Sequence, residues 1–492
     1  MLPSHPILSC EEARTLEQGL FAGDEAAEWA AMLRAGAAVA EAARRDFDEI
    51  GGFPENGRVL VLAGKGHNGG DALLAARHLL ARYPRATAEV VFVFGERALR
   101  PLAWRAWQYA QETGRERWTQ REPSTAGEWA GKGYDLGFDG IFGFQFRPPV
   151  EPPVAELIER VNAAPIRLRA AVDLPSGGLL RADFTYATGA VKTPILTDAN
   201  AGRLRYLDLG FFPREAPGAQ RVLTPAVLAP LAALRPAHCD KRDFGHLFVI
   251  GGSHNYPGAV LMTVLAALRS GVGLVTAFVP EPLVPAYAAR VPEAMWVGCP
   301  LTPEGRLALE GLHLVRERIE RATALAIGPG LGRERETMAL VREILKVSAL
   351  PAVLDADALQ PELVRGAKGP LVLTPHAGEF QRIAAGATLE TFARTSGTTV
   401  VLKGPVTQIA SGETVYHSIF GGPVLARGGS GDLLAGIVGS MLAQAPGDPA
   451  LAAARGVVWH GRAAEALARA QGQAAVRTTD VLDYLAEALR SE

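Results

Sequence analysis

Short apolar runs that end in glycine or aspartate, each followed by a segment of helical character, recur along the whole chain. Runs of this kind occupy residues 58–64, 89–94, 134–142 and 168–174 in the first half and 245–250, 324–327, 371–373 and 398–402 in the second. Continuous apolar runs of this length are typical of parallel strands buried on both faces. Their alternation with helices predicts open sheets covered by helices on both sides, and such sheets gather ligands at the carboxyl ends of their strands.

The chain has 492 residues, which is too long for one ordinary core, so we expect two α/β domains. We predict the last strand of the first sheet at 206–210. Residues 213–220 contain two prolines and a glycine and are predicted to be a linker between domains 1–212 and 221–492. Helices are expected over residues 11–50, interrupted by a turn of small residues at Met32–Gly36.

Composition and charge exclude several classes of function. The net charge of −2 argues against a broad nucleic-acid surface, though it leaves room for one local phosphate pocket. Cys10, Cys239 and Cys299 are far apart and odd in number, which predicts neither a disulfide framework nor a metal site. The first residues lack a basic segment followed by an apolar stretch, and no apolar run reaches membrane-spanning length. We therefore expect a soluble, cytoplasmic protein.

A glycine-rich turn follows the first buried run. Residues 65–71 read Lys-Gly-His-Asn-Gly-Gly-Asp and precede a helix predicted over 72–80, so this turn is expected to bind phosphate. It lacks the GxGxxG pattern of ordinary dinucleotide-binding domains. Asp71, Asp139 and Asp173 each lie at or just beyond a strand end, and together with Asn68 and Ser176 we expect them to converge. Any one of them alone could merely cap a helix or form a turn.

A second anion-binding turn is predicted at Gly428–Asp432, directly before an apolar helix. Glycines let backbone amides point inward together, and the helix that follows adds its positive end. Asp432 would repel an anion, so we interpret it as the base that accepts a proton from a hydroxyl group approaching the phosphate. A glycine-rich turn capped by aspartate also opens many helices without any chemistry.

Three motifs of the first half carry a family resemblance. GKGHNGGD, FDGIFG and VDLPSG, at residues 64–71, 138–143 and 172–177, resemble the epimerase domain of the bifunctional NAD(P)H-hydrate repair enzymes, a Rossmann-like three-layer domain. The resemblance implies epimerisation of NADHX and NADPHX, the hydrated forms of the cofactors, with Asp173 as acid/base at C6. It implies a potassium ion on Asn68, Asp139 and Ser176. The substrate-binding residues that it implies are His67, Asn68, Gly69, Gly70, Asp71, Gly143 and Asp173.

The first half departs from the family pattern at three places. The family usually reads Asn-Asn-Gly-Gly-Asp-Gly, and this chain has His67 for the first Asn and Ala72 for the last Gly. Where the family commonly has Gly-Thr-Gly-Leu, this chain has Gly-Phe-Gln-Phe at residues 143–146. The missing second glycine removes a place for close approach of backbone to phosphate. A ligand-binding role without catalysis is therefore kept as an alternative for this half.

Six motifs of the second half resemble the ribokinase-like superfamily and, within it, the ADP/ATP-dependent NAD(P)H-hydrate dehydratases, over nearly all of residues 225–490. They read GGSHNYPGA, GPGLG, LDADAL, TPHAGEF, VVLKG and GGSGD. The resemblance implies a three-layer α/β/α domain. The nucleotide-binding residues that it implies are Lys403, Gly404, Pro405, Val406, Thr407 and Gly431, and the substrate-binding residues are Ala259, Gly330, His376 and Asp432. Glu379 would orient magnesium-bound water. Asp355 and Asp357 could cap a turn or line the site, and neither is assigned a role from the sequence.

The two halves together predict repair of hydrated nicotinamide cofactors. The first half would interconvert R- and S-NAD(P)HX, and the second would dehydrate the S form with Mg²⁺ and ADP, or ATP in its place, to give NAD(P)H with release of AMP and phosphate. The resemblance also implies a homo-oligomer. The alternative is a ribokinase-like small-molecule kinase with a non-catalytic N-terminal domain, for which a stable phosphorylated product would be the signature.

Overall fold

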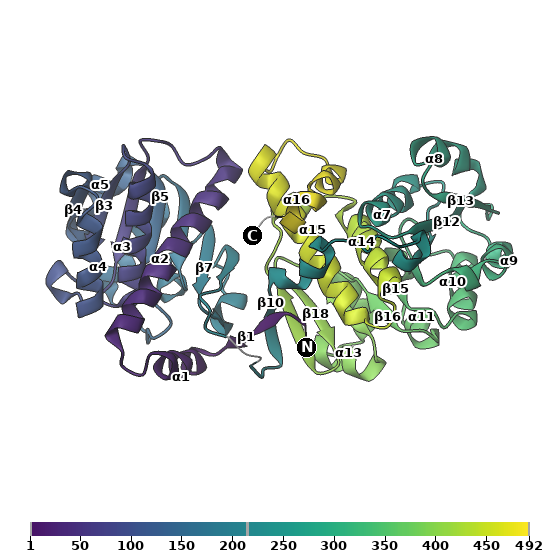
Figure 1. Cartoon of the computed structure of the whole chain (residues 1–492), viewed down its shortest axis with the longest axis horizontal. Helices are drawn as coiled ribbons and strands as arrows, with labels where there is room; N and C mark the ends of the chain where they lie inside the picture. The colour runs from purple at the N-terminus through teal and green to yellow at the C-terminus, as the bar shows by residue number, and fades with distance from the viewer. Residues whose placement is uncertain (1, 213–215, 491–492) are drawn as a thin grey trace. The chain divides into compact units, whose positions relative to one another are not determined.

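The chain divides mainly between Pro217 and Gly218 into two units, and the short segment Arg469–Gly472 counts with the N-terminal unit. The computed structural model describes residues 2–212 and 216–490 (Figure 1). Of the linker predicted at 213–220, residues 213–215 lie outside the described residues, and Gln220 already begins a strand. Residues 2–4 belong to the C-terminal unit, not to the predicted domain 1–212, because the buried Arg221 donates hydrogen bonds to Ser4 Oγ at 2.8 Å and Ser4 O at 2.7 Å.

The N-terminal unit is built on a sheet of seven parallel strands in the order β4-β3-β2-β5-β6-β7-β9 (Figure 1). The strands are β2 (Arg58–Ala63), β3 (Thr87–Phe92), β4 (Trp118–Arg121), β5 (Tyr134–Gly140), β6 (Ile166–Val172), β7 (Phe184–Thr188) and β9 (Arg203–Leu207). A short pair, β1 (Ser4–Leu8) with β8 (Val191–Lys192), is also parallel. The last strand of this sheet, β9, lies at the edge as predicted, but it ends at Leu207, so the predicted bounds of 206–210 were too far along the chain.

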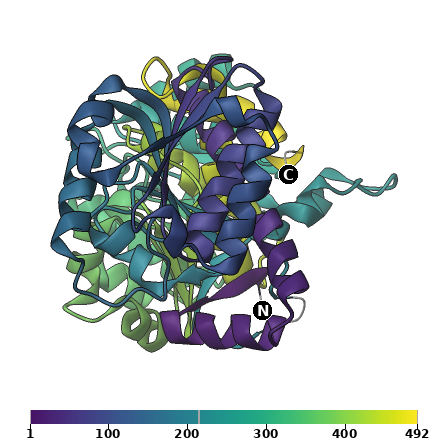
Figure 2. The same cartoon turned by 90° about the vertical axis from the view of Figure 1, so that its left-hand side faces the viewer.

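Helices cover both faces of this sheet because its strands bury alternate residues in different cores. On β2, Val59 and Val61 pack with α2 (Glu25–Phe47) and α3 (His67–Arg82), whereas Leu60 and Leu62 pack with α6 (Pro152–Ala163). The remaining helices are α1 (Cys10–Phe21), α4 (Pro101–Gln111) and α5 (Ala126–Trp129). Figure 2 shows this unit from the side of its β4 edge, with the strands running between the two helical layers.

The turn predicted at Met32–Gly36 is wrong, since α2 runs through these residues without interruption. Gly36 serves packing instead: a Cβ there would collide with the Cβ of Leu74 on α3. The missing side chain thus lets two helices approach closely, a use of glycine that looks like a turn in sequence.

The C-terminal unit has a second, larger sheet. Its strands run in the order β13-β12-β11-β14-β15-β16-β17-β18-β19-β10, and only the pairings of β18 with β17 and β19 are antiparallel. The bounds are β10 (Gln220–Leu223), β11 (His246–Ile250), β12 (Leu274–Pro280), β13 (Met295–Cys299), β14 (Ala324–Ile327), β15 (Ala352–Leu354), β16 (Leu371–Leu373), β17 (Thr399–Leu402), β18 (Thr407–Ser411) and β19 (Thr414–Ser418).

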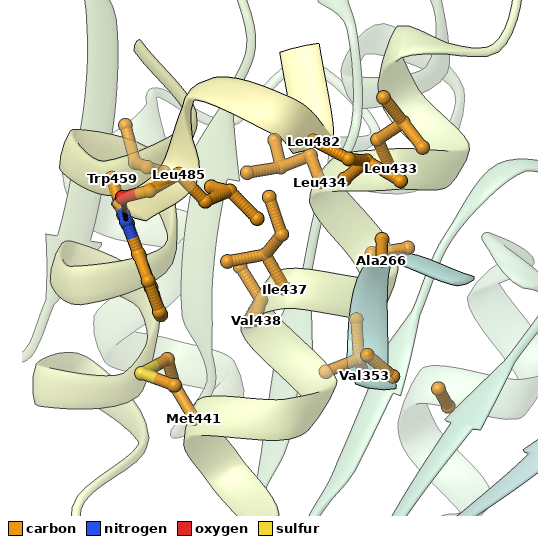
Figure 3. Close-up of a cluster of buried hydrophobic side chains, with 14 of the residues drawn as sticks. Ala266, Val353, Leu433, Leu434, Ile437, Val438, Met441, Trp459, Leu482 and Leu485 are labelled. Atoms are coloured by element: carbon orange, nitrogen blue, oxygen red, sulfur yellow. Dashed lines mark hydrogen bonds between the residues drawn. The ribbon is translucent and has the colours of Figure 1, made fainter. Parts of the chain in front are cut away.

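One face of this sheet packs on α7 (Pro257–Arg269), α14 (Ser430–Gln444) and α15 (Pro449–Gln471), and the other on helices that include α10 (Arg335–Val347), α12 (Ala377–Ala384) and α13 (Leu389–Ser396). Figure 3 shows Ile437 and Val438 of α14 between Val353 of β15 and Trp459 of α15. Trp459 Nε1 also donates a hydrogen bond to Leu485 O at 2.8 Å. Helix α14 is therefore held on both sides, which fixes the position of its N-terminus.

The predicted fold class is confirmed: both units are three-layer α/β/α structures on largely parallel sheets. Within the described ranges, none of the helices is both long and apolar enough to cross a membrane.

Candidate functional site

The N-terminal unit contains a cavity of about 490 Å³ at the carboxyl ends of its strands. It opens beside the N-terminus of α3, where Gly66, His67 and Asn68 line its wall. No side chain caps this end of α3 within the described part of the chain, so the first-turn amides remain available to an anion. Lys65 and Arg100 line the same cavity and add positive charge. This end of the cavity has the character of a phosphate site.

Asp173 lies deep in the cavity, just after β6. Its φ of 68° places the backbone in the left-handed region, which is uncommon for a non-glycine residue, and its N–H donates to Tyr186 O at 2.9 Å. The Asp173 carboxylate accepts a hydrogen bond from Lys192 Nζ, and both side chains are almost fully buried. Lys192 also donates to Thr188 O at 2.9 Å. The pair is a charged, water-excluded group placed against the cavity.

Two further carboxyl groups line the cavity near this pair. Asp71 is buried, and no described residue donates a hydrogen bond to its Oδ1. Burial first, and then the charges of Asp173 and Glu17, raise the pKa of Asp71 well above its usual value. Burial also raises the pKa of the half-buried Glu17, on α1, to about 7. These two carboxyl groups therefore tend to hold protons at neutral pH, whereas Asp173 is paired with a lysine.

Asn68, Asp139 and Ser176 are brought together by the topology. Asp139 accepts from Ser176 Oγ at 2.6 Å and from Ser176 N at 2.8 Å. The backbone of Phe142 joins the third residue, because its N–H donates to Ser176 Oγ at 2.9 Å while Asn68 Nδ2 donates to its carbonyl at 2.8 Å. Burial raises the pKa of Asp139 to about 6, against the opposing effect of the Ser176 hydrogen bonds. The cluster contains only oxygen atoms as candidate cation ligands.

Not every residue predicted for the N-terminal site lies on the cavity wall. His67, Asn68, Asp71, Gly143 and Asp173 line it. Gly69 and Gly70 are buried in the first turn of α3. A Cβ on Gly69 would collide with the backbone of Gly64, and a Cβ on Gly70 with Met32, so both glycines allow close packing.

The loop after β5 gives the cavity an aromatic wall. Phe142 and Phe146 stack with ring centroids 4.0 Å apart and planes inclined by 24°, and Phe94 lies 5.9 Å from Phe142. Phe144 points to the deep end, where Lys192 Nζ lies 5.2 Å from its ring centroid. The Gly-Phe-Gln-Phe departure thus replaces a small-residue segment with aromatic rings that line the cavity.

In the C-terminal unit, the N-terminus of α14 meets the carboxyl ends of the central strands. Gly429 precedes the helix with a φ of 89°, which glycine adopts without strain, and Asp432 lies in the first turn. Burial, and then the charge of Asp355, raises the pKa of Asp432 to about 7, although Lys403 opposes the shift. A carboxyl group with this pKa can accept and return a proton at neutral pH.

A second lysine–aspartate pair lies against this helix end. Lys403 Nζ donates to Asp355 Oδ1 at 3.0 Å, and Thr374 Oγ1 donates to the same oxygen at 2.7 Å. A Cβ on Gly431 would stand 3.2 Å from Lys403 Nζ, so the first turn of α14 touches the pair. Asp355, left without a role from sequence, is therefore the buried partner that holds Lys403 beside Asp432.

The segment predicted to bind nucleotide, Lys403–Thr407, connects β17 to β18. Lys403 N donates to Pro375 O at 2.8 Å, and Thr407 Oγ1 donates to Gly404 O at 3.3 Å. Gly404 and Pro405 are exposed, and Val406 is half-buried. The structure thus places an accessible turn next to the positively charged Lys403.

His376 and Glu379 form the N-terminal cap of α12. The amides of Gly378 and Glu379 donate to His376 Nδ1 at 3.1 and 3.3 Å, and His376 N donates to Glu379 Oε2 at 2.9 Å. The His376 ring is 61% exposed, and its backbone pairs with that of Lys403. The capping role of these side chains is structural, and the exposed ring remains accessible to a ligand near Lys403.

Ala259 and Gly330, both predicted to contact substrate, lie together. A Cβ on Gly330 would stand 3.2 Å from Ala259 Cβ, and Gly330 has a φ of 70°. Asp357 accepts hydrogen bonds from Gly332 N at 3.0 Å and from Arg333 Nε at 2.9 Å, and so fixes the GPGLG loop.

Two residues of the N-terminal site were missed by sequence reasoning. Lys192 lies on the two-residue strand β8, with no glycine motif nearby, and Glu17 lies on an ordinary amphipathic helix. Neither carries a local signal, since each becomes notable only through the carboxyl groups that the fold places beside it.

Two family models match this chain. The one described as NAD(P)H-hydrate dehydratase matches residues 247–487, and the one described as YjeF-related protein N-terminus matches residues 29–197.

Full-length relatives match nearly the whole chain. The bifunctional NAD(P)H-hydrate repair enzyme of Gloeobacter violaceus is 37% identical over 94% of this chain and 93% of its own length. Those of Moorella thermoacetica and Pyrobaculum aerophilum are 34% and 33% identical, over 94% and 96% of this chain and 92% and 97% of theirs.

Among solved structures, the ADP/ATP-dependent NAD(P)H-hydrate dehydratase of Bacillus subtilis, co-crystallised with ATP and Mg²⁺, is 28% identical. It covers 52% of this chain and 93% of its own, with a TM-score of 0.45.

Proposed function

The chain belongs to the family of bifunctional NAD(P)H-hydrate repair enzymes, and on that premise we propose how its two sites divide the reaction. The N-terminal unit is the epimerase that interconverts R- and S-NAD(P)HX, and the C-terminal unit is the dehydratase that returns the S form to NAD(P)H. The observation that carries this division is that each unit has its own lysine–aspartate pair with a buried carboxylate at the carboxyl ends of its strands, Asp173–Lys192 and Asp355–Lys403.

Epimerisation needs a proton donor and a proton acceptor at C6 of the hydrated ring. As the C6–O bond breaks, the lone pair of N1 forms an N1=C6 double bond and the departing hydroxyl takes a proton. Glu17 supplies that proton, since it lines the cavity and burial raises its pKa to about 7. Water then adds to the other face of C6 and loses a proton to Asp173, which Lys192 holds in place. Two carboxyl environments with different proton affinities thus provide the acid and the base.

The residues of the Asn68–Asp139–Ser176 cluster fit a potassium ion. All candidate donors are oxygens, which suit a hard cation. Asp139 is a buried carboxylate, and among the described residues no cationic side chain donates a hydrogen bond to it, so a bound cation would offset the burial that raises its pKa. When bound there, potassium would screen the substrate pyrophosphate. We expect the melting temperature of the N-terminal unit to rise with KCl more than with LiCl, and this difference to vanish in Asp139→Asn.

Dehydration begins with phosphoryl transfer in the C-terminal unit. Asp432 accepts the proton of the C6 hydroxyl as that oxygen attacks the terminal phosphorus of ADP and the bond to AMP breaks. The amides of the first turn of α14 and the Lys403 ammonium stabilise the negative charge that develops on the phosphoryl oxygens. The N1 lone pair then expels phosphate from C6, and loss of the C5 proton restores NAD(P)H.

Magnesium fits this site through few protein ligands. Among the described residues there is no group of three or more His, Cys, Asp or Glu side chains arranged to hold a metal ion. Mg²⁺ typically keeps several waters and binds through one or two carboxylates together with substrate phosphates. Glu379, whose Oε2 is occupied by capping α12, would act through water. When bound with the nucleotide, the ion neutralises phosphate charge.

The three cysteines are free thiols, which suits a reducing compartment such as the cytoplasm. The homo-oligomer that the family resemblance implies stays a prediction, which light scattering on the purified protein would test.

The test is recovery of NADH absorbance from a mixture of R- and S-NADHX with Mg²⁺ and ADP, repeated with ATP. Wild type should consume both epimers, Asp432→Asn neither, and Asp173→Asn only the S form at the enzymatic rate. Rates must be compared with the spontaneous interconversion of the epimers. A stable phosphorylated product without NADH would favour a small-molecule kinase. Slow use of the R form by wild type would leave the N-terminal unit a binding module.

A further inference from the structure

We propose that Phe144 forms the wall against which the nicotinamide ring of the substrate lies during epimerisation, and so determines how tightly this enzyme binds the reacting ring. The inference rests on the proposed epimerase function and adds a specificity residue to it.

The loop that carries Phe144 is built to present it. Phe146 N donates to Gly143 O at 3.0 Å, which closes a four-residue turn with Phe144 and Gln145 at its centre. One end of the turn is anchored by the stacking of Phe146 on Phe142. At the other end, Gly143 lies close to Asn68, since a Cβ there would stand 3.4 Å from Asn68 Cβ. The turn places Phe144 in the cavity wall.

Phe144 also lies beside the reacting groups. It lines the same cavity as Asp173, and the Lys192 ammonium that binds Asp173 lies 5.2 Å from the Phe144 ring centroid. This distance is within the range of a cation–π contact. A ring positioned with its C6 next to Asp173 would therefore have Phe144 within reach of one face.

The chemistry of the substrate suits this wall. In the hydrated ring, N1, C2=C3 and the carboxamide form a flat conjugated system, whereas C5 and C6 are saturated. The flat part can stack on an aromatic face, and the C–H groups of C5 and C6 can contact the same face. An aliphatic side chain of similar volume would exclude water equally well but would offer no such face.

The experiment compares Phe144→Leu with Phe144→Tyr in the full chain. Epimerase activity is measured without nucleotide, by following interconversion of separated R- and S-NADHX chromatographically. Dehydratase activity on S-NADHX with ADP in the same preparation reports that the protein is folded and correctly quantified. We expect Phe144→Leu to raise the epimerase KM about tenfold, the effect of losing one aromatic contact, with kcat within about threefold. Phe144→Tyr should restore the KM to within about twofold.

The proposal is overturned if Phe144→Leu keeps the wild-type KM, or if Phe144→Tyr is as impaired as Phe144→Leu, since the ring face would then not matter. A fall in kcat at unchanged KM would also overturn it and would assign Phe144 to the Asp173–Lys192 pair. Absence of epimerase activity in wild type would instead refute the proposed function, so the two failures are distinguishable.

Discussion

Replacement of Asp432 by asparagine should abolish dehydration and at the same time stabilise the C-terminal unit at neutral and alkaline pH. Asp432 is mostly buried in the first turn of α14, close to the charge of Asp355, and its pKa of about 7 lies well above the usual 3.8. The fold therefore favours the neutral carboxyl, whereas catalysis needs the charged one. Asparagine keeps the size of the side chain and removes the charge.

The expected magnitude follows from the two pKa values. A group whose pKa is raised in the folded state binds more protons there than in the unfolded state, so stability falls as pH rises between the two values. At about 1.4 kcal/mol per pH unit, a shift from 3.8 to about 7 lowers the free energy of unfolding by about 4 kcal/mol above pH 7. At pH 5.5 the same group lowers it by about 2 kcal/mol. The advantage of Asp432→Asn should thus grow by about 2 kcal/mol between pH 5.5 and 8.

Calorimetry of the ligand-free protein at pH 5.5 and pH 8 measures this difference, with the C-terminal transition assigned by its shift on addition of ADP. Because any fixed effect of the amide is the same at both pH values, only the change with pH reports the charge. An Asp432→Asn advantage that is constant or shrinks with pH would refute the raised pKa. Retained NADH recovery in this variant would refute the role of Asp432 as the base.

Further expectations concern the N-terminal unit. Asp173→Asn should lower the epimerase rate about 10²- to 10⁴-fold, while dehydration of pure S-NADHX continues at the wild-type rate; equal loss of both activities would contradict separate sites. The wild-type epimerase rate should fall as pH rises through about 7, where Glu17 loses its proton, and Glu17→Gln should be slow at all pH values and lack this limb in a pH–rate profile. Gly64→Ala should destabilise the unit by about 1–3 kcal/mol in calorimetry, because its Cβ would collide with Ile141 O, whereas Gly66→Ala, with its nearest atom 4.0 Å away, should leave the melting temperature unchanged.

The site residues that lie at strand ends could be predicted from the sequence. Asp139 lies at the end of β5, and Asp173 and Ser176 follow β6. Because β5 and β6 are neighbouring parallel strands, their carboxyl ends lie at the same edge of the sheet, and Ser176 therefore contacts Asp139. The glycine-rich turn before α14 could also be predicted, because a run of glycines directly before an apolar helix is visible in the local sequence.

The parts that sequence reasoning missed depend on contacts between distant segments. Lys192 can bind the Asp173 carboxylate only because the fold brings β8 next to Asp173. Likewise, Asp355 binds Lys403 only because Lys403 directly follows β17. Gly36 was predicted to lie in a turn, but it lies within α2, where the absence of a side chain lets α3 approach closely. Glycine is used for both purposes, so the sequence alone does not distinguish them. Local patterns therefore identified the motifs, and tertiary contacts decided which of the remaining side chains join them.

The contact between Ser4 and Arg221 can form only late in translation. The two residues are separated by 217 positions, so at about 5–20 residues per second the ribosome adds Arg221 roughly 10 to 40 s after Ser4. During that time the start of β1, at Ser4, has no Arg221 to contact while the whole N-terminal sheet is synthesised. A C-terminal fragment beginning at residue 218 would lack Ser4, which accepts two hydrogen bonds from Arg221 in the whole chain. Supplying residues 2–8 as a separate peptide should then raise the yield of soluble fragment.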